Sequence, residues 1–80
     1  MYKVYILRNS KFGRYYVGCT KDLTKRLDLH NKGKVRSTKA YIPWEVVYTE
    51  GYEIKEEAYK REKEIKSYRS GEAFKRLLNR

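Results

Sequence analysis

The sequence predicts a small domain of mixed α/β (α+β) class, in which helices flank a three-stranded antiparallel sheet in the chain order β-β-α-β-α-α. Alternating apolar and polar residues, rich in β-branched and aromatic side chains, predict three strands at 2–8, 14–19 and 44–50. Apolar residues at helical spacing predict three helices, at 20–33, 55–68 and beyond 70. Since 80 residues supply about one small core, residues 1–80 are expected to form a single domain.

The first two strands are expected to pair as an antiparallel hairpin. One face of the first strand carries Tyr2, Val4 and Ile6, and the other carries Lys3, Tyr5 and Leu7. Residues 9–13 then supply a turn of about five residues, a length that hairpins commonly use. The second strand, 14–19, returns beside the first.

The first helix has recognisable ends and an unusual inward face. Thr20 or Asp22 can cap its start, and Gly33 can end it. The stripe that should face the core consists of Leu23, Arg26, Leu27 and His30. An arginine and a histidine on such a stripe are unexpected in a helix whose role is only structural, so both are candidates for function.

The segment after this helix is polar and basic at 34–41 and is expected to form a loop along a basic surface. Pro43 precedes the third strand, where proline is tolerated, and Gly51 and Tyr52 lead from that strand towards the next helix.

Two helices complete the chain. On the helix at 55–68, Ala58, Glu62 and Ile65 share one face. Ser70 can cap a short last helix with Phe74, Leu77 and Leu78 as its apolar stripe.

The charge of the chain indicates a polyanionic partner. Twenty Lys and Arg against ten Asp and Glu give a net charge of +10, and residues 1–40 hold eleven of the cations with only two Asp. A generally basic surface is the plainer interpretation, but aromatic residues interleave with the cations, which favours nucleic acid, DNA first. The candidate contacts to it are Lys11, Arg14, Lys21, Lys25, Lys34, Arg36 and Lys39.

Two further features concern the compartment. The single cysteine, Cys19, excludes an internal disulfide and fits a reducing, cytoplasmic setting. No apolar run approaches the ~20 residues that a membrane-spanning helix requires, and no signal-peptide pattern opens the sequence.

The residues alone leave the chemistry open. Glu62 could hold a divalent metal, or it could form an ion pair with Lys66 or with a basic residue of the first helix. Arg26 could bind phosphate or pair with Glu62, and His30 could transfer a proton or be a satisfied, half-buried imidazole. Tyr5 and Tyr16 could meet across the hairpin. A zinc site or a glycosidase-like carboxylate pair is not indicated.

Five positions, in order and with compatible spacing, resemble the GIY-YIG nuclease superfamily over nearly the whole chain. Val4-Tyr5-Ile6 and Tyr16-Val17-Gly18 correspond to its two-part signature. Arg26 corresponds to the helix arginine of the family, His30 to a position of its flap endonuclease branch, and Glu62 to its metal-binding glutamate. The resemblance is strongest to the small, stand-alone bacterial branch.

The sequence departs from the family pattern at three places. Val4 stands where the family name has glycine, and Cys19 stands where the excision-repair incision branch often has lysine, with Lys21 two residues further on. The late asparagine of that branch has no counterpart, since Asn79 lies too far along. These departures bear on catalytic rate more than on fold.

The resemblance implies a metal-dependent endonuclease that hydrolyses phosphodiester bonds in branched, damaged or single-stranded DNA, as in DNA repair. Glu62 would hold one Mg²⁺ or Mn²⁺. Tyr5 or Tyr16 would orient or deprotonate the attacking water, and Arg26 would stabilise charge on phosphorus. His30 would support the phosphate or the base, and Gly18 would be structural.

Two other functions stay open. The alternative to an enzyme is a catalytically weak or inactive nucleic-acid-binding module that uses the same basic groove, and a third is a module that docks an acidic protein. The resemblance also leads us to expect a protein partner or a dimer for targeting.

Overall fold

The structure, a computed structural model, describes residues 1–69 and 71–79 and contains the expected β-β-α-β-α-α order. Three strands form one antiparallel sheet in the order β2-β1-β3. The elements are β1 (Tyr2–Asn9), β2 (Arg14–Thr20), α1 (Leu23–Asn31), the 3-10 helix η1 (Lys39–Tyr41), β3 (Glu45–Tyr52), α2 (Lys55–Ser67) and α3 (Glu72–Leu78). The predicted fold class and hairpin are therefore confirmed.

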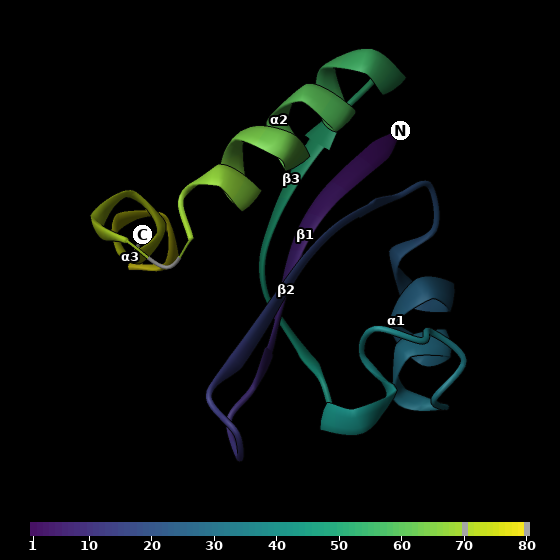
Figure 1. Ribbon diagram of the computed structural model, residues 1–80. Helices are drawn as coiled ribbons and strands as arrows, with labels where there is room; N and C mark the ends of the chain where they lie inside the picture. The colour runs from purple at the N-terminus through teal and green to yellow at the C-terminus, as the bar shows by residue number, and fades with distance from the viewer. Residues whose placement is uncertain (70, 80) are drawn as a thin grey trace.

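The sheet is covered on both faces, which explains why the central strand is almost wholly apolar. Helices α2 and α3 lie on one side of the sheet, and α1 with η1 lies on the other (Figure 1). Val4 and Ile6 of β1 are fully buried in the cluster under α2 and α3, whereas Tyr5 and Leu7 are buried with Trp44 on the opposite face. The edge strand β2 therefore lies between two layers of helix, where residues of α1 and α2 can approach each other.

The third strand differs from its predicted bounds of 44–50. It begins at Glu45 and continues through Gly51 and Tyr52, which pair with Lys3 and Tyr2. Trp44 precedes the strand as a buried residue, and its indole Nε1 donates to the carbonyl of Thr38 at 3.0 Å.

Helix α1 has the predicted caps. Asp22 accepts a hydrogen bond from the backbone N–H of Lys25 at 3.1 Å, so Asp22, not Thr20, is the cap. Gly33 has a φ of +74°, and the N–H groups of Gly33 and Lys34 bond the carbonyls of His30 and Leu29, a Schellman ending that favours glycine.

The segment 34–41, predicted as a loop, is more ordered than expected because it contains η1 and the buried Thr38. Two asparagines bind the backbone of residues 41–44. Asn9 donates to the carbonyls of Tyr41 and Pro43, and Asn31 exchanges two hydrogen bonds with the backbone of Trp44. These bonds fix the segment against the hairpin turn and α1.

The apolar faces of the last two helices are as predicted. Ala58 and Ile65 of α2 are buried, as are Phe74 and Leu77 of α3, while Leu78 is partly buried. Gly71 occupies the N-cap position of α3, and Ser70, the predicted cap, lies outside the described residues. Within residues 1–69 and 71–79, no helix has the length and apolar character needed to cross a membrane.

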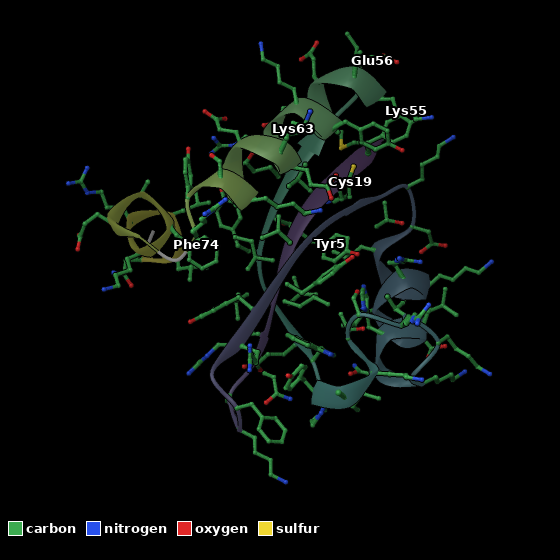
Figure 2. All side chains as sticks on the ribbon, viewed as in Figure 1. Tyr5, Cys19, Lys55, Glu56, Lys63 and Phe74 are labelled. Carbon is green, nitrogen blue, oxygen red and sulfur yellow. The ribbon has the colours of Figure 1, made fainter. Side chains whose placement is uncertain are left out.

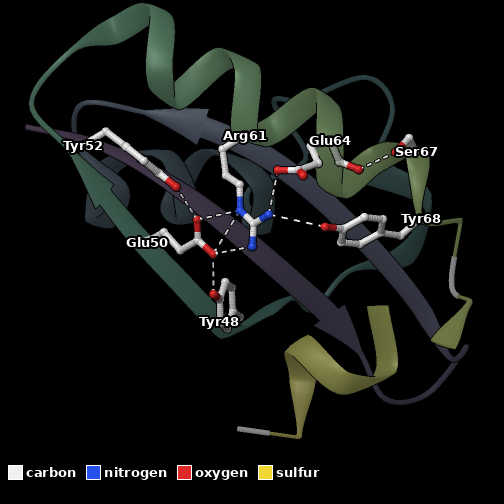
Figure 3. A network of polar contacts seen from close by, with 7 residues as sticks. All are labelled: Tyr48, Glu50, Tyr52, Arg61, Glu64, Ser67 and Tyr68. Carbon is white, nitrogen blue, oxygen red and sulfur yellow. Dashed lines mark hydrogen bonds and ion pairs between the residues drawn. The ribbon is translucent and has the colours of Figure 1, made fainter. Parts of the chain in front are cut away.

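A polar network on the sheet face under α2 fixes this helix to β3 (Figure 3). The guanidinium of Arg61 donates to both carboxylate oxygens of Glu50, with Nε to Oε1 at 2.9 Å, and also bonds Glu64 and Tyr68. The hydroxyls of Tyr48 and Tyr52 donate to the same carboxylate. Burial alone would raise the pKa of Glu50, but the hydrogen bonds from Arg61, Tyr48 and Tyr52 lower it to about 2.

Candidate functional site

A chain of buried polar side chains joins β1 to α1. The Tyr5 side chain points from the sheet towards α1 (Figure 2), and its hydroxyl lies 3.0 Å from Nε2 of His30. The other ring nitrogen of His30, Nδ1, lies 2.8 Å from Oγ1 of Thr38. Tyr5, His30 and Thr38 are each at most 1% exposed, so solvent does not compete for these bonds.

The partners of Thr38 assign the proton on the imidazole. The Thr38 hydroxyl donates its one hydrogen to the carbonyl of Val35 at 3.4 Å, so Oγ1 accepts from the Nδ1–H of His30. Nε2 of His30 is then the acceptor for the Tyr5 hydroxyl. Burial, followed by the charge of Arg26, lowers the pKa of His30 below its ordinary 6.5, which keeps the ring neutral at pH 7. His30 is thus a satisfied imidazole, fully buried and not half-buried.

Arg26 lies beside both tyrosines of the signature. The phenol of Tyr5 and, less strongly, that of Tyr16 raise the pKa of Arg26 above its ordinary value. Burial raises the pKa of Tyr5 above 10.0, although the nearby guanidinium of Arg26 opposes this. The rings of Tyr5 and Tyr16 lie 6.4 Å apart, and that of Tyr16 lies 4.9 Å from His30. Four predicted residues, Tyr5, Tyr16, Arg26 and His30, are therefore together.

Gly18 is needed because of the Tyr5 ring. Gly18 pairs with Tyr5 across the hairpin, and a Cβ on Gly18 would lie 2.6 Å from Cζ of Tyr5 and closer still to its hydroxyl. A side chain at this position would therefore displace the phenol from His30. The expected structural role of Gly18 has this specific cause.

Glu62 lies on α2 and is not part of the buried series of hydrogen bonds that joins Tyr5, His30 and Thr38. Its carboxylate forms an ion pair with Lys66 at 2.8 Å and retains 20% of its side-chain exposure. Of the ion pairs that the sequence left open for Glu62, the one with Lys66 is formed, and one with Arg26 is not among those of the described residues. The charge of Glu62 adds to burial in raising the pKa values of both Tyr5 and Cys19.

A hard divalent ion at Glu62 would have few protein ligands. Within residues 1–69 and 71–79, no group of three or more His, Cys, Asp and Glu is placed to hold a metal. Mg²⁺ is often held by one or two carboxylates, with water and phosphate oxygens completing the octahedron. Glu62, which is partly exposed, fits that arrangement as a single protein ligand.

The predicted basic contacts surround α1 and the hairpin turn, and all of them are exposed: Lys11, Arg14, Lys21, Lys25, Lys34, Arg36 and Lys39. Some are held by aromatic rings, since Arg14 lies 4.8 Å from the centroid of Tyr41 and Lys21 lies 5.3 Å from that of Tyr2. The cations therefore lie in and around α1 and at the hairpin turn.

One member of the buried chain, Thr38, was not predicted from the sequence. It lies in a segment without periodicity, and a threonine there resembles any polar loop residue. The nearest signal was Trp44, a few residues later, because the Thr38 carbonyl accepts from its indole.

A family model for the GIY-YIG catalytic domain matches residues 1–73. The chain belongs to the GIY-YIG family. UPF0213 proteins of Staphylococcus aureus strains Mu3 and MW2 are 47% identical to it over 66 residues, which is 81% of this chain and 79% of each relative. The solution NMR structure of a UPF0213 protein from Bacillus halodurans is 34% identical, with a TM-score of 0.61, and the match covers 99% of this chain and 84% of that one.

Membership of the GIY-YIG family confirms the resemblance seen in the sequence, and the UPF0213 relatives confirm its small branch. The two halves of the signature are neighbours in the structure, because β1 and β2 pair with Tyr5 opposite Gly18. The GIY-YIG family is one of nucleases, which agrees with the basic surface and a nucleic acid as substrate.

Proposed function

We propose that this GIY-YIG protein is a metal-dependent endonuclease that hydrolyses phosphodiester bonds in DNA, with branched, damaged or single-stranded DNA as substrates and a role in cytoplasmic DNA repair. The observation that carries the proposal is the meeting of Tyr5, Tyr16, Arg26 and His30 at β2, with the charge of Glu62 acting on the same phenol.

The two tyrosines take different roles in this proposal. Tyr5 is 1% exposed, has a raised pKa and donates to His30, so it remains a phenol that fixes the position of Arg26. Tyr16 is half-buried, so it is more accessible to an attacking water than Tyr5 is. Tyr16 therefore orients or deprotonates the attacking water. His30 acts indirectly, because it holds the Tyr5 hydroxyl in place.

Arg26 and Glu62 act on the phosphate. The Arg26 guanidinium stays charged and, placed between the phenols, stabilises the negative charge that builds on phosphorus. Glu62 is the residue that would hold Mg²⁺ or Mn²⁺ beside the scissile bond. A divalent ion, when bound, polarises the phosphodiester and stabilises the leaving oxygen.

The first experiment is cleavage of labelled plasmid, flap, fork and single-stranded DNA, with RNA alongside, in Mg²⁺, in Mn²⁺ and in chelator. Glu62→Gln should lower the rate by at least about 100-fold, the scale on which loss of one charge-stabilising group acts. The control, Glu57→Gln, removes an exposed carboxylate from the same helix and should cut normally. Cutting by the unmodified protein in chelator would overturn the metal-dependent mechanism. Undiminished cutting by Glu62→Gln would do the same.

A second candidate is the catalytically weak or inactive nucleic-acid-binding module. The ion pair of Glu62 with Lys66 favours it, since Lys66 competes with a metal for the carboxylate. Tight, salt-sensitive binding without cutting, by both the unmodified protein and Glu62→Gln, would support this function. Targeting by a dimer or a protein partner stays a prediction, which the gel-filtration mass tests for the dimer.

A further inference from the structure

Residues of β2, α2 and α3 surround a cavity of about 230 Å³ next to the candidate site. Its floor is formed by the apolar side chains of Val17, Ile65 and Phe74, which are at most 8% exposed. Two cations, Lys66 and Arg69, stand at its side, and none of the described residues that line it is acidic. An apolar floor with cations beside it suits a planar ring that carries a phosphate.

Aromatic rings complete the wall on the side of β2. Tyr15 is 40% exposed and packs edge-on against Phe74, with ring centroids 5.2 Å apart. This contact fixes the ring of Tyr15 while leaving part of it open to solvent. A fixed, partly exposed ring beside cations is the arrangement on which unpaired bases stack.

The cavity shares Tyr16 with the candidate site and Lys66 with the ion pair of Glu62. Tyr16, which contacts His30 with its ring, also lines the cavity. Lys66 lines it too and forms the ion pair with Glu62 at 2.8 Å. A nucleotide in the cavity therefore contacts Tyr16 and Lys66, the ion-pair partner of Glu62.

Arg69 occupies its place at a conformational cost. Its φ is +48°, in the left-handed region that favours glycine after a helix. Asparagine also tolerates this region. Asn and Gly are therefore substitutions at position 69 that remove the cation without adding backbone strain, which makes a clean test possible.

Beyond Tyr15 a second hollow, of about 320 Å³, continues the path. It is lined by Tyr15 itself and by Arg8 and Asn79, again with no acidic residue among those described. Tyr15 therefore lines both hollows.

We propose that the 230 Å³ cavity receives an unpaired base of the DNA strand that crosses Glu62, a proposal that rests on the proposed function and specifies its substrate as DNA with unpaired nucleotides. Tyr15 stacks on the base, and Lys66 and Arg69 bind the adjacent phosphate. A paired base cannot enter, because both of its faces are covered by its neighbours in the duplex. The protein therefore prefers single strands, flaps and frayed ends to intact duplex.

Binding in chelator tests this without any cleavage. Fluorescence anisotropy compares fluorescein-labelled oligo-dT of about ten nucleotides, within the usual range for such sites, with a blunt duplex of two complementary strands. Tyr15→Leu, which keeps an apolar contact to Phe74, should raise Kd for oligo-dT at least about fivefold, the lower end of the loss of one base stack. Arg69→Asn and Arg69→Gly should each reduce the salt slope of log K by about 0.7, the value of one single-strand phosphate contact.

The control variant, Arg76→Gln, removes the same charge from an exposed position on α3 and should change Kd for oligo-dT less than about twofold. Thermal melting verifies that each variant folds. Equal weakening of oligo-dT and duplex binding, unchanged oligo-dT binding by Tyr15→Leu and Arg69→Asn, or no binding of oligo-dT by the unmodified protein would each overturn the proposal.

Failure of the base-cavity proposal can be distinguished from failure of the endonuclease proposal. If the unmodified protein cuts no DNA in Mg²⁺ or Mn²⁺ while Tyr15→Leu still loses oligo-dT binding, the endonuclease proposal fails and the base cavity stands. If Glu62→Gln abolishes cutting while Tyr15→Leu binds and cuts flaps normally, the base cavity fails and the endonuclease stands.

Discussion

Gly18 controls the position of the Tyr5 phenol, because any side chain at 18 would occupy the space that the ring needs. Gly18→Ala should lower the free energy of unfolding by about 1–3 kcal/mol, the cost of overpacking a filled core. The cost should shrink in a Tyr5→Leu background, where the ring is absent. A double-mutant cycle by chemical denaturation measures this coupling.

Gly51 offers a matched control for that cycle. It also lies in a strand of the same sheet, but a Cβ there would meet the Sδ of Met1, the far end of a flexible side chain that can move. Gly51→Ala should therefore be nearly neutral. An equal loss in both variants would mean that Gly18 matters for strand pairing in general and not for Tyr5.

The residues of the candidate site that belong to sequence motifs could be named from the sequence. The residue that supports them from outside the motifs, Thr38, could not. Tyr5, Gly18 and Arg26 stand at recognisable spacings. Thr38 does not, since its contact with His30 depends on the path of the segment after α1, which Asn9 and Asn31 fix through backbone carbonyls. Such contacts have no periodicity in the sequence.

At the scale of elements, the attachment of α2 to β3 depends on the carboxylate of Glu50. Its pKa is lowered from 4.5 to about 2 in the folded protein, so the unfolded chain binds a proton more readily between those values. Stability from this group is therefore complete above about pH 4.5 and is lost as the pH falls towards 2. The total is up to roughly 3 kcal/mol, because one pKa unit is worth about 1.4 kcal/mol.

Thermal melting from about pH 6 to about pH 2 measures this loss, and Glu50→Gln should flatten that part of the profile. The comparison is Asp28→Asn, which breaks the exposed pair with Lys32 and should change stability by less than about 1 kcal/mol. Parallel acid profiles for the unmodified protein and Glu50→Gln would contradict the assignment.

The bounds of β3 show why element ends were harder to predict than element types. Glycine weakens a strand in isolation, so Gly51 was expected to end this one. In the folded chain Gly51 and Tyr52 pair with Lys3 and Tyr2 at the start of β1, and this pairing extends the strand. Long-range partners therefore decided an end that local propensity placed two residues too early.

For the whole molecule, the uneven charge predicts which surface meets DNA. Replacing Lys34, Arg36 and Lys39 with Gln should weaken DNA binding and reduce the salt slope by up to about 0.7–0.9 for each phosphate that is no longer neutralised. The control replaces three exposed cations of the second half, Lys55, Lys75 and Arg76, with Gln. Titrations at several salt concentrations should show a smaller change for the control. Identical slopes for both triple variants would indicate attraction by net charge alone.

The layered architecture could be predicted only in part. The alternation in 2–8 placed Val4 and Tyr5 on opposite faces, as observed, but did not show that both faces are buried. That follows from helices on both sides of the sheet, which a strand pattern alone does not specify.

The central place of β1 has a consequence for how the chain folds as it is made. β1 leaves the ribosome first but obtains its second partner only when Tyr52 has emerged, because β3 pairs along its length. Until then the hairpin of β1 and β2 exposes one apolar edge with unsatisfied backbone groups, a template for association with other chains. Delaying the emergence of Tyr52 after Thr20 has emerged should therefore increase aggregation of the nascent protein.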